Sequence, residues 1–524
     1  MSEGEGANGS GIQRGQMMAL LAAFLGWMFD GLEMGLFPLV ARPALKELLA
    51  GDGYTTVTDG DVGLWYGVAT ATFLVGAATG GVLFGWLGDR IGRVRAMMLS
   101  VFTYAIFSGL CGFANSATQI AILRFLSALG MGGEWSLGVA LVMEIWPDRS
   151  RAILAGLIGA AANFGFLFIA VLGLGVVEYV QETRSFLEMI MPVDWVNRLL
   201  NNSAWRFLMF LGAVPALLTF FIRIFVPESA KWEEEQSRGS TSHWATRDLM
   251  GVLIGAAGAL GMVYLWASEL TWAGGGVLAV RLAGSAVALV VVTLGYLYPV
   301  ARYLNRAESS SAEAAETPAP SQRGFVIRRM ILGACLGGIA LLGTWASIQQ
   351  APTFARKVAE ESGRSAVAGS YTQIASAFGA IIATMIAPLV GNWLGRRVTY
   401  ALLCLLSLGS TLMFYRPWQT TVVFDNSFLI LVFLAGGLTS SFYGWLPLYL
   451  PELFPTRVRA TGQGFSFNFG RVIAAIGTLQ GGYLINEIYK GDYAFVCSVM
   501  SLVYLVGMLV IWLAPETKGQ PLPE

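Results

Sequence analysis

The sequence contains little charge. Only 13% of its 524 residues are aspartate, glutamate, lysine or arginine, and 55% are hydrophobic, whereas roughly a quarter of a soluble domain is charged. The 33 basic residues balance the 33 acidic residues, so no excess of positive charge points to nucleic acid as a partner. This composition excludes an ordinary soluble domain and indicates a protein with many membrane spans, whose first partner is the lipid bilayer.

The side chains of catalytic and metal sites are scarce as well. The one histidine, His243, lies in a polar segment, and the four cysteines (Cys111, Cys335, Cys404 and Cys497) are scattered over apolar segments without the spacing of metal ligands. The sequence has no G-x-x-x-x-G-K-[ST] motif to bind nucleotide phosphates. We therefore expect no enzyme, no metal and no cofactor. Any proton chemistry inside the membrane must use carboxylates.

Long apolar runs recur along the chain. A membrane-spanning helix needs about 20 mainly apolar residues, and runs of that kind predict an all-α polytopic membrane protein with fourteen spans, arranged as six, two and six. The runs cover residues 17–40, 62–84, 95–115, 118–145, 151–178, 205–226, 249–270, 277–304, 327–350, 366–390, 397–415, 428–450, 461–486 and 494–513.

The same runs divide the chain into segments. Residues 1–16 are polar and rich in glycine, so we expect them to be disordered, and the run that follows lacks the features of a cleavable signal. The added pair of helices contains few charges, and we expect it at the periphery, outside any pathway. The predicted segments are the N-terminal six-helix bundle 17–226, the helix pair 249–304, a cytoplasmic linker 305–326, the C-terminal six-helix bundle 327–513 and a cytoplasmic tail 514–524.

Basic residues are concentrated in one set of loops. Arginines such as Arg90, Arg93 and Arg328 follow every second span, on the side where the N-terminus lies, and the other loops hold far fewer. Basic loops stay in the cytoplasm. The pattern therefore predicts that both termini are cytoplasmic and that the protein resides in a plasma membrane, such as the bacterial inner membrane.

Three loop motifs occur twice, once in each half of the chain. "EIWPDRSRA" (Glu144–Ala152) matches "ELFPTRVRA" (Glu452–Ala460), "GDRIGRVR" (Gly88–Arg95) matches "GNWLGRRV" more loosely, and "PESAK" is similar to "PETK". Each follows the second, fourth or sixth span of its half. Parallel repeats of this kind indicate a transporter in which two bundles rock about a central site.

These motifs also carry a family resemblance. "GWLGDRIGRVR" resembles the signature between spans two and three of the major facilitator superfamily. "RFLSALGMGGEW", "PESAKW" and "PETKG" resemble the branch that holds sugar porters, organic ion transporters and aromatic-acid or sialate proton symporters, and the fourteen-span layout most resembles the sialate:proton symporter group. The resemblance covers nearly the whole chain and implies two pseudo-symmetric six-helix bundles. We expect a monomer.

By this resemblance, the charged loop residues form a gate that latches the two bundles together at the cytoplasmic side. In the second repeat Asn392 stands in the place of Asp89 and Trp393 in the place of Arg90, so the latch there is expected to use Glu452 with Arg457 or Arg459. The alternative is that these charges only fix topology and cap helices. The first-repeat gate residues are Asp89, Arg90, Arg93, Glu144, Arg149 and Arg151.

Charged residues also occur inside the spans, where they are costly and mark a pathway. The first span holds Asp30 and Glu33, three residues apart, and Glu134 lies near the middle of the fourth. Proton symporters of the resembled branch carry acids in both places, so we predict Asp30 and Glu134 as proton-coupling sites, with Glu33 in reserve. The alternative is a permanent salt bridge between these acids and a buried arginine.

Arg471, in "GFSFNFGRVIAAIG", is the candidate for substrate binding. It matches the substrate-facing arginine of organic anion transporters, and a guanidinium binds carboxylates through paired hydrogen bonds. The alternative is that it pairs with a span carboxylate and only ties helices together. Other candidates for lining the cavity are Arg124, Asn163, Trp345, Gln349, Gln350, Tyr443 and Asn468.

These features favour a proton-coupled symporter for a small organic anion, such as a sialate, a monocarboxylate or an aromatic acid. Protons and the anion are then its small partners. Three alternatives stay open: an organic anion exchanger or uncoupled facilitator, a sugar-type metabolite transporter, and a transporter-like sensor that binds its ligand without moving it.

Overall fold

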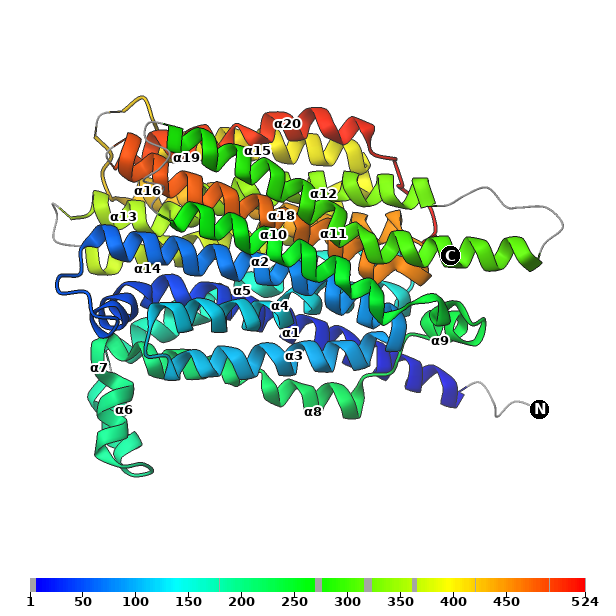
Figure 1. Cartoon of the computed structure of the whole chain (residues 1–524), viewed down its shortest axis with the longest axis horizontal. Coiled ribbons are helices and arrows are strands. Elements are labelled where there is room, and N and C mark those ends of the chain that lie inside the picture. Colours follow the sequence, from blue (N-terminus) through cyan, green and yellow to red (C-terminus); the bar gives the residue numbers. More distant parts are fainter. Residues whose placement is uncertain are drawn as a thin grey trace.

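The computed structural model describes residues 6–178, 180–268, 276–314, 323–360, 365–419, 421–489 and 491–523, and these residues contain helices and no strand. Most helices run along the longest axis of the molecule (Figure 1). The beginning of the first helix and the end of the last lie at the same end of the molecule, which we call the terminal end (right in Figure 1).

Residues 6–225 are called the N-terminal half here. Its helices connect through short turns and through the loops that carry the repeated motifs. They are α1 (Gly6–Gly51), α2 (Asp59–Ile91), α3 (Arg93–Leu110), α4 (Ala117–Ile145), α5 (Arg151–Glu178), α6 (Val180–Glu188), α7 (Val193–Phe210) and α8 (Ala216–Phe225).

Residues 323–513 are called the C-terminal half. A short helix α9 (Ala230–Ser237) and a hairpin of α10 (Leu249–Ala267) and α11 (Val277–Ala314) stand between the halves in the sequence. The helices of the C-terminal half are α12 (Arg323–Trp345), α13 (Ala351–Val358), α14 (Ser365–Leu394), α15 (Arg396–Tyr415), α16 (Asn426–Ser440), α17 (Phe442–Tyr449), α18 (Arg459–Tyr483), α19 (Tyr493–Ser501) and α20 (Val503–Val510).

Twelve helical segments of the described residues are long and apolar enough to cross a membrane. The expected spans 205–226 and 461–486 are not among them. A 3-10 turn at Leu211–Ala213 separates α7 from α8, so the first of these runs is divided. Gln463, Asn468 and Arg471 lower the apolar character of α18. The full count of fourteen and the arrangement as six, two and six stay predictions.

Two boundaries differ from those expected. α1 begins at Gly6, inside the segment 1–16 that was expected to be disordered, and residues 1–5 lie outside the described part. The end of this extension is tied to α4, because the Gln16 side chain donates to the Ile145 carbonyl (3.1 Å) and the Trp146 indole donates to the Gln16 carbonyl (3.0 Å). α11 continues to Ala314, well into the expected linker 305–326, of which residues 315–322 lie outside the described part.

Glycines allow the helices to cross in backbone contact. A Cβ atom at Gly31 of α1 would lie 1.9 Å from the Ala162 carbonyl oxygen of α5, and one at Gly165 would lie 2.0 Å from the Met28 carbonyl oxygen. α2 and α18 cross in the same way between the halves, since a Cβ at Gly464 would lie 2.3 Å from the Gly81 carbonyl oxygen. Small residues at such crossings are the usual means of packing helices in lipid.

The halves meet along two seams. α2 packs against α18, and α5 packs against α14 and α17. The α10–α11 hairpin covers the first seam, because α10 packs on α2 while α11 packs on α12 and α18. A hydrogen bond of 2.7 Å between the hydroxyls of Tyr296 and Thr79 fixes α11 to α2. The hairpin therefore contacts both halves.

The glycine crossing between α1 and α5 can be tested by substitution. Gly31→Val should destabilise the protein by about 1–3 kcal/mol, because the added methyl groups overlap the α5 backbone and separate the helices. Thermal unfolding in detergent measures the effect. Gly409→Val is the matched control, since a Cβ at Gly409 meets no atom within 4 Å. Equal melting temperatures for the two variants would contradict the close crossing.

Candidate functional site

A cavity of about 940 Å³ lies between the halves. Its wall includes the last third of α1, the start of α2 and the end of α18, together with the turn between α12 and α13. These elements meet at the end of the molecule opposite the terminal end, where α1 finishes and α2 begins (Figure 1). The cavity therefore opens away from the loops that carry the repeated motifs.

The cavity wall is polar and carries more positive than negative charge. Three arginines (Arg42, Arg281 and Arg356) and one carboxylate, Asp61, line it. Amides and hydroxyls line the deeper part: Asn163, Thr344, Gln349, Gln350, Gln373, Ser376 and Ser440. A cleft with one sign of charge in low-dielectric walls concentrates ligands of the opposite sign, and these walls therefore favour anions.

A small pocket of about 40 Å³ continues the cavity inward, and the two share Asn163, Phe166, Thr344, Gln349 and Ser440. Five of the predicted residues line this inner pocket: Asn163, Trp345, Gln349, Tyr443 and Arg471.

The Arg471 side chain is only 1% exposed, and its guanidinium carbon lies 5.4 Å from the centre of the Phe467 ring. Its Nε and Nη1 atoms have no hydrogen-bond partner among the described residues. Free guanidinium donors at the bottom of a cavity suit the binding of a carboxylate.

Asp30 and Glu134 lie behind this pocket. Both are buried, and no other described residue donates a hydrogen bond to either carboxylate. The two carboxyl groups lie within hydrogen-bond reach of each other, so a proton on one can be shared with the other. The Glu134 carboxylate points at α1, since a Cβ at Gly26 would lie 1.7 Å from its Oε1 atom. Asp30 is one turn further along α1 and interacts electrostatically with Glu134 and Arg471.

Asp30 and Glu134 line neither cavity. Trp27, three residues before Asp30, does line the inner pocket. Asp30 is thus about one helical turn from its wall. The alternative of a permanent salt bridge is not realised either, because neither acid forms an ion pair with an arginine among the described residues.

Glu33 and Arg124 form a separate buried pair. The Arg124 Nη1 atom lies 3.4 Å from Glu33 Oε1, and the Ser108 hydroxyl also donates to Glu33. The Arg124 guanidinium carbon lies 4.0 Å and 4.4 Å from the ring centres of Phe37 and Phe73. The structure therefore places Arg124 in a paired, aromatic environment, and it lines neither cavity.

Asn468 is also absent from both cavity walls. It is fully buried and donates to the carbonyls of Gly132 and Gly464, both at 3.0 Å. The first of these bonds joins α18 to α4, so Asn468 contributes to the contact between the halves.

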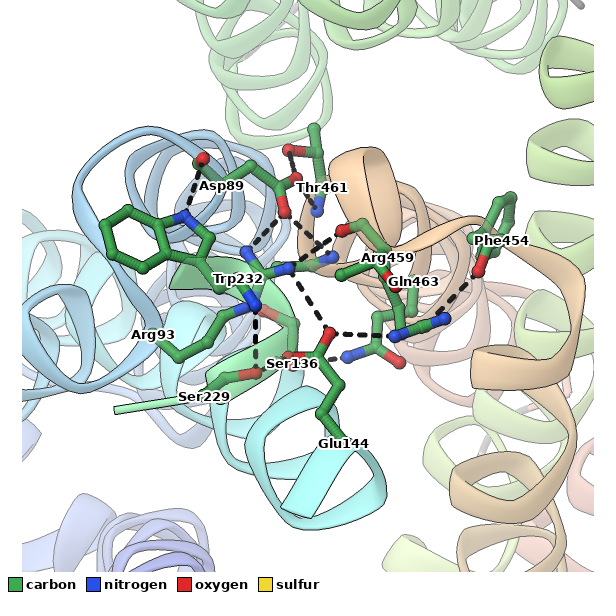
Figure 2. Close-up of polar contacts among 12 residues, drawn as sticks. Asp89, Arg93, Ser136, Glu144, Ser229, Trp232, Phe454, Arg459, Thr461 and Gln463 are labelled. Carbon is green, nitrogen blue, oxygen red and sulfur yellow. Dashed lines mark hydrogen bonds and ion pairs between the residues drawn. The ribbon is translucent and has the colours of Figure 1, made fainter. Parts of the chain in front are cut away.

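At the terminal end, a network of buried charges joins the halves (Figure 2). Arg93 donates to Asp89 at 2.5 Å and to Glu144 at 3.3 Å, and Glu144 also accepts from Arg459 of the C-terminal half at 2.9 Å. Asp89 accepts from the backbone N–H of Thr461 at 2.9 Å. Each of the two carboxylates in the N-terminal half thus contacts the C-terminal half.

The segment that follows α20 reinforces this network. Its Pro523 carbonyl accepts from Arg459 at 2.6 Å, and its Gln520 carbonyl accepts from Arg151 at 3.5 Å. The predicted Arg151 therefore lies beside the network. Residues 515–523 cross from the C-terminal half to the first residue of α5.

Three of the predicted gate residues lie elsewhere. Arg90 donates to the Thr246 hydroxyl at 2.8 Å, Arg149 is exposed, and Arg457 interacts electrostatically with Tyr303 of the hairpin.

The expected partnership of Glu452 with Arg457 or Arg459 is wrong. Glu452 accepts from two nitrogens of Arg396, at 2.7 Å and 3.0 Å, and from the Thr517 hydroxyl at 2.6 Å. Arg396 occupies in the second repeat the place of Arg93 in the first. Because Arg396 satisfies Glu452, Arg459 is left to pair with the N-terminal half.

The repeats also share a cap. Glu228 of "PESAK" accepts from the Arg93 backbone N–H at 2.9 Å, and Glu516 of "PETK" accepts from the Arg396 backbone N–H, also at 2.9 Å. Both carboxylates therefore occupy the start of a helix, where negative charge is favoured. Burial raises the pKa of Glu228, whereas for Glu516 the backbone N–H groups outweigh burial and lower the pKa.

Sequence reasoning missed several cavity residues. Thr344 and Ser440 bear no signal that separates them from other hydroxyls in apolar helices. Arg281 could have been found, because an arginine inside an apolar hairpin is as unusual as those inside the central spans. Arg42 and Arg356 were read only as loop charges.

Removing Glu144 should disrupt the terminal end. Glu144→Gln leaves the fully buried Arg459 without its carboxylate, and breaking a buried pair costs about 3–5 kcal/mol. The measurement is thermal unfolding in detergent. Glu234→Gln removes a surface pair with Arg238, whose side chains are 60% and 59% exposed, and should cost less than about 1 kcal/mol. A Glu144→Gln protein as stable as this control would show that the network contributes little.

Comparisons with known proteins agree with this architecture. The chain is 26% identical to a probable 4-methylmuconolactone transporter of Cupriavidus pinatubonensis, over 96% of this chain and 91% of that protein. It is 24% identical to the cis,cis-muconate transport protein of Acinetobacter baylyi, over 93% of this chain and 94% of that protein. The fold matches a solved proton:xylose symporter with a TM-score of 0.63, over 97% of this chain and 98% of the other, at 16% identity.

The profile of the family described as "Sugar (and other) transporter" matches residues 18–275 and 321–524. The resemblance read from the loop motifs is thereby confirmed at the level of the superfamily. The chain is an integral membrane transporter, and it belongs to the sugar (and other) transporter family of the major facilitator superfamily.

Proposed function

We propose that this protein is a proton-coupled symporter of small organic anions. The observation that carries the proposal is the position of Arg471. Its donors are unpaired at the inner end of a cavity with more positive than negative charge, and it lies within electrostatic reach of the buried acid Asp30. Two relatives that match nearly the whole chain are named for muconolactone and muconate transport. Their names support an organic acid as the substrate.

In the proposed binding mode, the carboxylate of the anion binds Arg471. Trp345 and Tyr443 line the same pocket and offer aromatic faces to the body of the substrate. Asn163 and Gln349 line both the pocket and the cavity, and Gln350 lines the cavity, so their amides can bind further polar groups. Sialates, monocarboxylates and aromatic acids all fit this chemistry.

Asp30 and Glu134 are proposed to carry the proton. An ionised carboxylate buried without a partner is very costly, and a proton on one of the two acids removes that cost and their mutual repulsion. When an anion neutralises Arg471, Asp30 loses its nearest favourable charge and its proton is held more firmly. Anion and proton then bind together, which couples their movement.

The network around Glu144 is proposed as the gate. Basic loops lie at the terminal end, so this end faces the cytoplasm and the cavity opens to the outside of a bacterial inner membrane. The conformation is then open outward and latched inward. Inward opening must break the contacts of Asp89 and Glu144 with the C-terminal half, while the Arg396–Glu452 pair, which is internal to that half, stays intact.

A sugar-type transporter is the second candidate. The adjacent amides of Gln349 and Gln350, with Asn163, provide donors and acceptors suited to hydroxyl groups, and the fold is that of a proton:xylose symporter. An anion exchanger differs from the proposed symporter only in the role of Asp30 and Glu134.

Substitution of Arg471 tests the substrate class. Arg471→Gln should weaken the binding of organic acids by at least about 100-fold, because a charged bidentate contact is lost. Arg471→Lys should retain part of the affinity. The measurement is a thermal-shift and calorimetric screen of the purified protein against organic acids and neutral sugars. Unchanged acid binding in Arg471→Gln, or stabilisation by sugars alone, would refute the anion proposal.

Substitution of the acids tests coupling. Glu134→Gln and Asp30→Asn should each abolish uphill uptake driven by an inward proton gradient in proteoliposomes, while exchange of internal for external substrate continues, because exchange requires no net proton movement. Glu360→Gln, at an exposed acid, is the control and should transport as the parent does. If both Glu134→Gln and Asp30→Asn retain gradient-driven uptake, the result contradicts the symport mechanism and favours exchange or facilitation.

A further inference from the structure

The α10–α11 hairpin forms part of the cavity wall. Trp266, Ala267 and Ser268 at the end of α10 line the cavity, and so does Arg281 in the first turns of α11. The expectation that the hairpin lies outside any pathway is therefore wrong. Because the hairpin packs on α2 of one half and on α18 of the other, these four residues belong to the side of the cavity where those two helices meet.

The Arg281 side chain is held in this wall by defined contacts. Its Nη2 atom donates to the Ser268 carbonyl at 3.1 Å. Its guanidinium carbon lies 5.3 Å from the centre of the Trp266 ring and 5.5 Å from that of Tyr483 in α18. Trp266 is fixed in turn, because its indole N–H donates to the Ser285 hydroxyl at 2.9 Å. The arginine is thus positioned by its own hairpin and by the C-terminal half.

This arginine is not neutralised. Neither Arg281 nor Arg356, the arginine that α13 adds to the same wall, forms an ion pair in the described part of the chain, and the Nε atom of Arg281 is buried without a hydrogen-bond partner. Asp61 is the one carboxylate among the lining residues. An arginine that served only as an interface anchor would extend to the lipid headgroups, whereas Arg281 lies half-buried beside the cavity.

The position of Arg281 is well separated from that of Arg471. Tyr483, which packs on Arg281, is twelve residues beyond Arg471 on the continuous helix α18. With a rise of about 1.5 Å per residue, the two positions are roughly 18 Å apart along the helix. A small carboxylate cannot bind both arginines at once through the same group, so they define two sites.

We propose that Arg281 forms an outer anion site at which a carboxylate binds before it reaches Arg471. The ligand class rests on the proposed function, since the same organic anion occupies both sites in turn. The outer site raises the local concentration of the anion at the cavity entrance and so speeds its arrival at the inner pocket. The hairpin thereby acquires a role in transport in addition to its packing on both halves.

A cysteine reporter at Ser268 tests the outer site without knowledge of the natural substrate. In a background with the four native cysteines replaced, Ser268→Cys is labelled with anionic sulfonatoethyl or cationic trimethylammonioethyl methanethiosulfonate. The probe anion is cis,cis-muconate at constant ionic strength. The measured quantity is the labelling rate of the anionic reagent divided by that of the cationic reagent. We expect this ratio to be about fivefold higher at Ser268→Cys than for a free thiol in solution. We also expect muconate to slow the labelling. Arg281→Gln should remove both effects, and Arg281→Lys should retain them.

Two results would overturn the outer site: no protection by muconate in the parent protein, or the same protection in Arg281→Gln as in the parent.

Arg471→Gln separates this proposal from the proposed function. It should abolish uptake and leave the protection of the Ser268→Cys reporter intact. If it also abolishes the protection, the cavity has one anion site and the outer site is wrong. If uptake survives Arg471→Gln while Arg281→Gln removes the protection, the outer site stands and the inner one is wrong. The melting temperature of each variant confirms folding.

Discussion

A charge buried in a membrane protein must be paired, hydrated or neutralised by a proton, and this constraint governs how the transporter is organised. The chain resolves it in two ways. Arg93, Glu144 and Arg459 are buried and form ion pairs with one another, as do Glu33 and Arg124. Asp30, Glu134 and Arg471 are equally buried, yet none of them forms an ion pair among the described residues. The paired charges hold one conformation together, and the unpaired ones are available to a ligand and a proton.

The two groups of charges lie at different depths, and the proposed mechanism depends on this separation. The paired network joins the halves at the terminal end, whereas the cavity separates them at the other. Glycine crossings such as Gly81 with Gly464 bring α2 and α18 into backbone contact between the two regions. In the proposed function the halves rotate about this contact when the network breaks, which would couple the two ends of the molecule.

Much of this could be predicted from the sequence. The all-helical membrane fold followed from composition and from the apolar runs, and the superfamily followed from the loop motifs. Arg471 could be selected as a cavity residue because charge is so costly inside a span that few explanations remain. The repeats also predicted correctly that Glu144 and Glu452 would meet arginines.

The pairing of these residues could not be predicted. Glu452, in the turn that follows α17, pairs with Arg396 at the start of α15 because α15 packs against α17. Arg124 pairs with Glu33 because α1 packs against α4. Which residues pair depends on the rotation and depth of each helix. A difference of a few ångströms in these positions changes the partner, and no sequence pattern predicts it. The same limit explains the hairpin: its apolar sequence predicts membrane insertion, and only its packing on α2 and α18 brings Arg281 to the cavity.

The central claim is that binding of an anion at Arg471 is linked to protonation of Asp30 or Glu134. Calorimetric titration of a bound organic acid in buffers of different ionisation enthalpy measures this linkage directly, because it counts the protons taken up with each anion. The account requires net proton uptake in the parent protein and none in a protein that carries both Asp30→Asn and Glu134→Gln. Anion binding without proton uptake by the parent, at every pH at which uptake is observed, would contradict it.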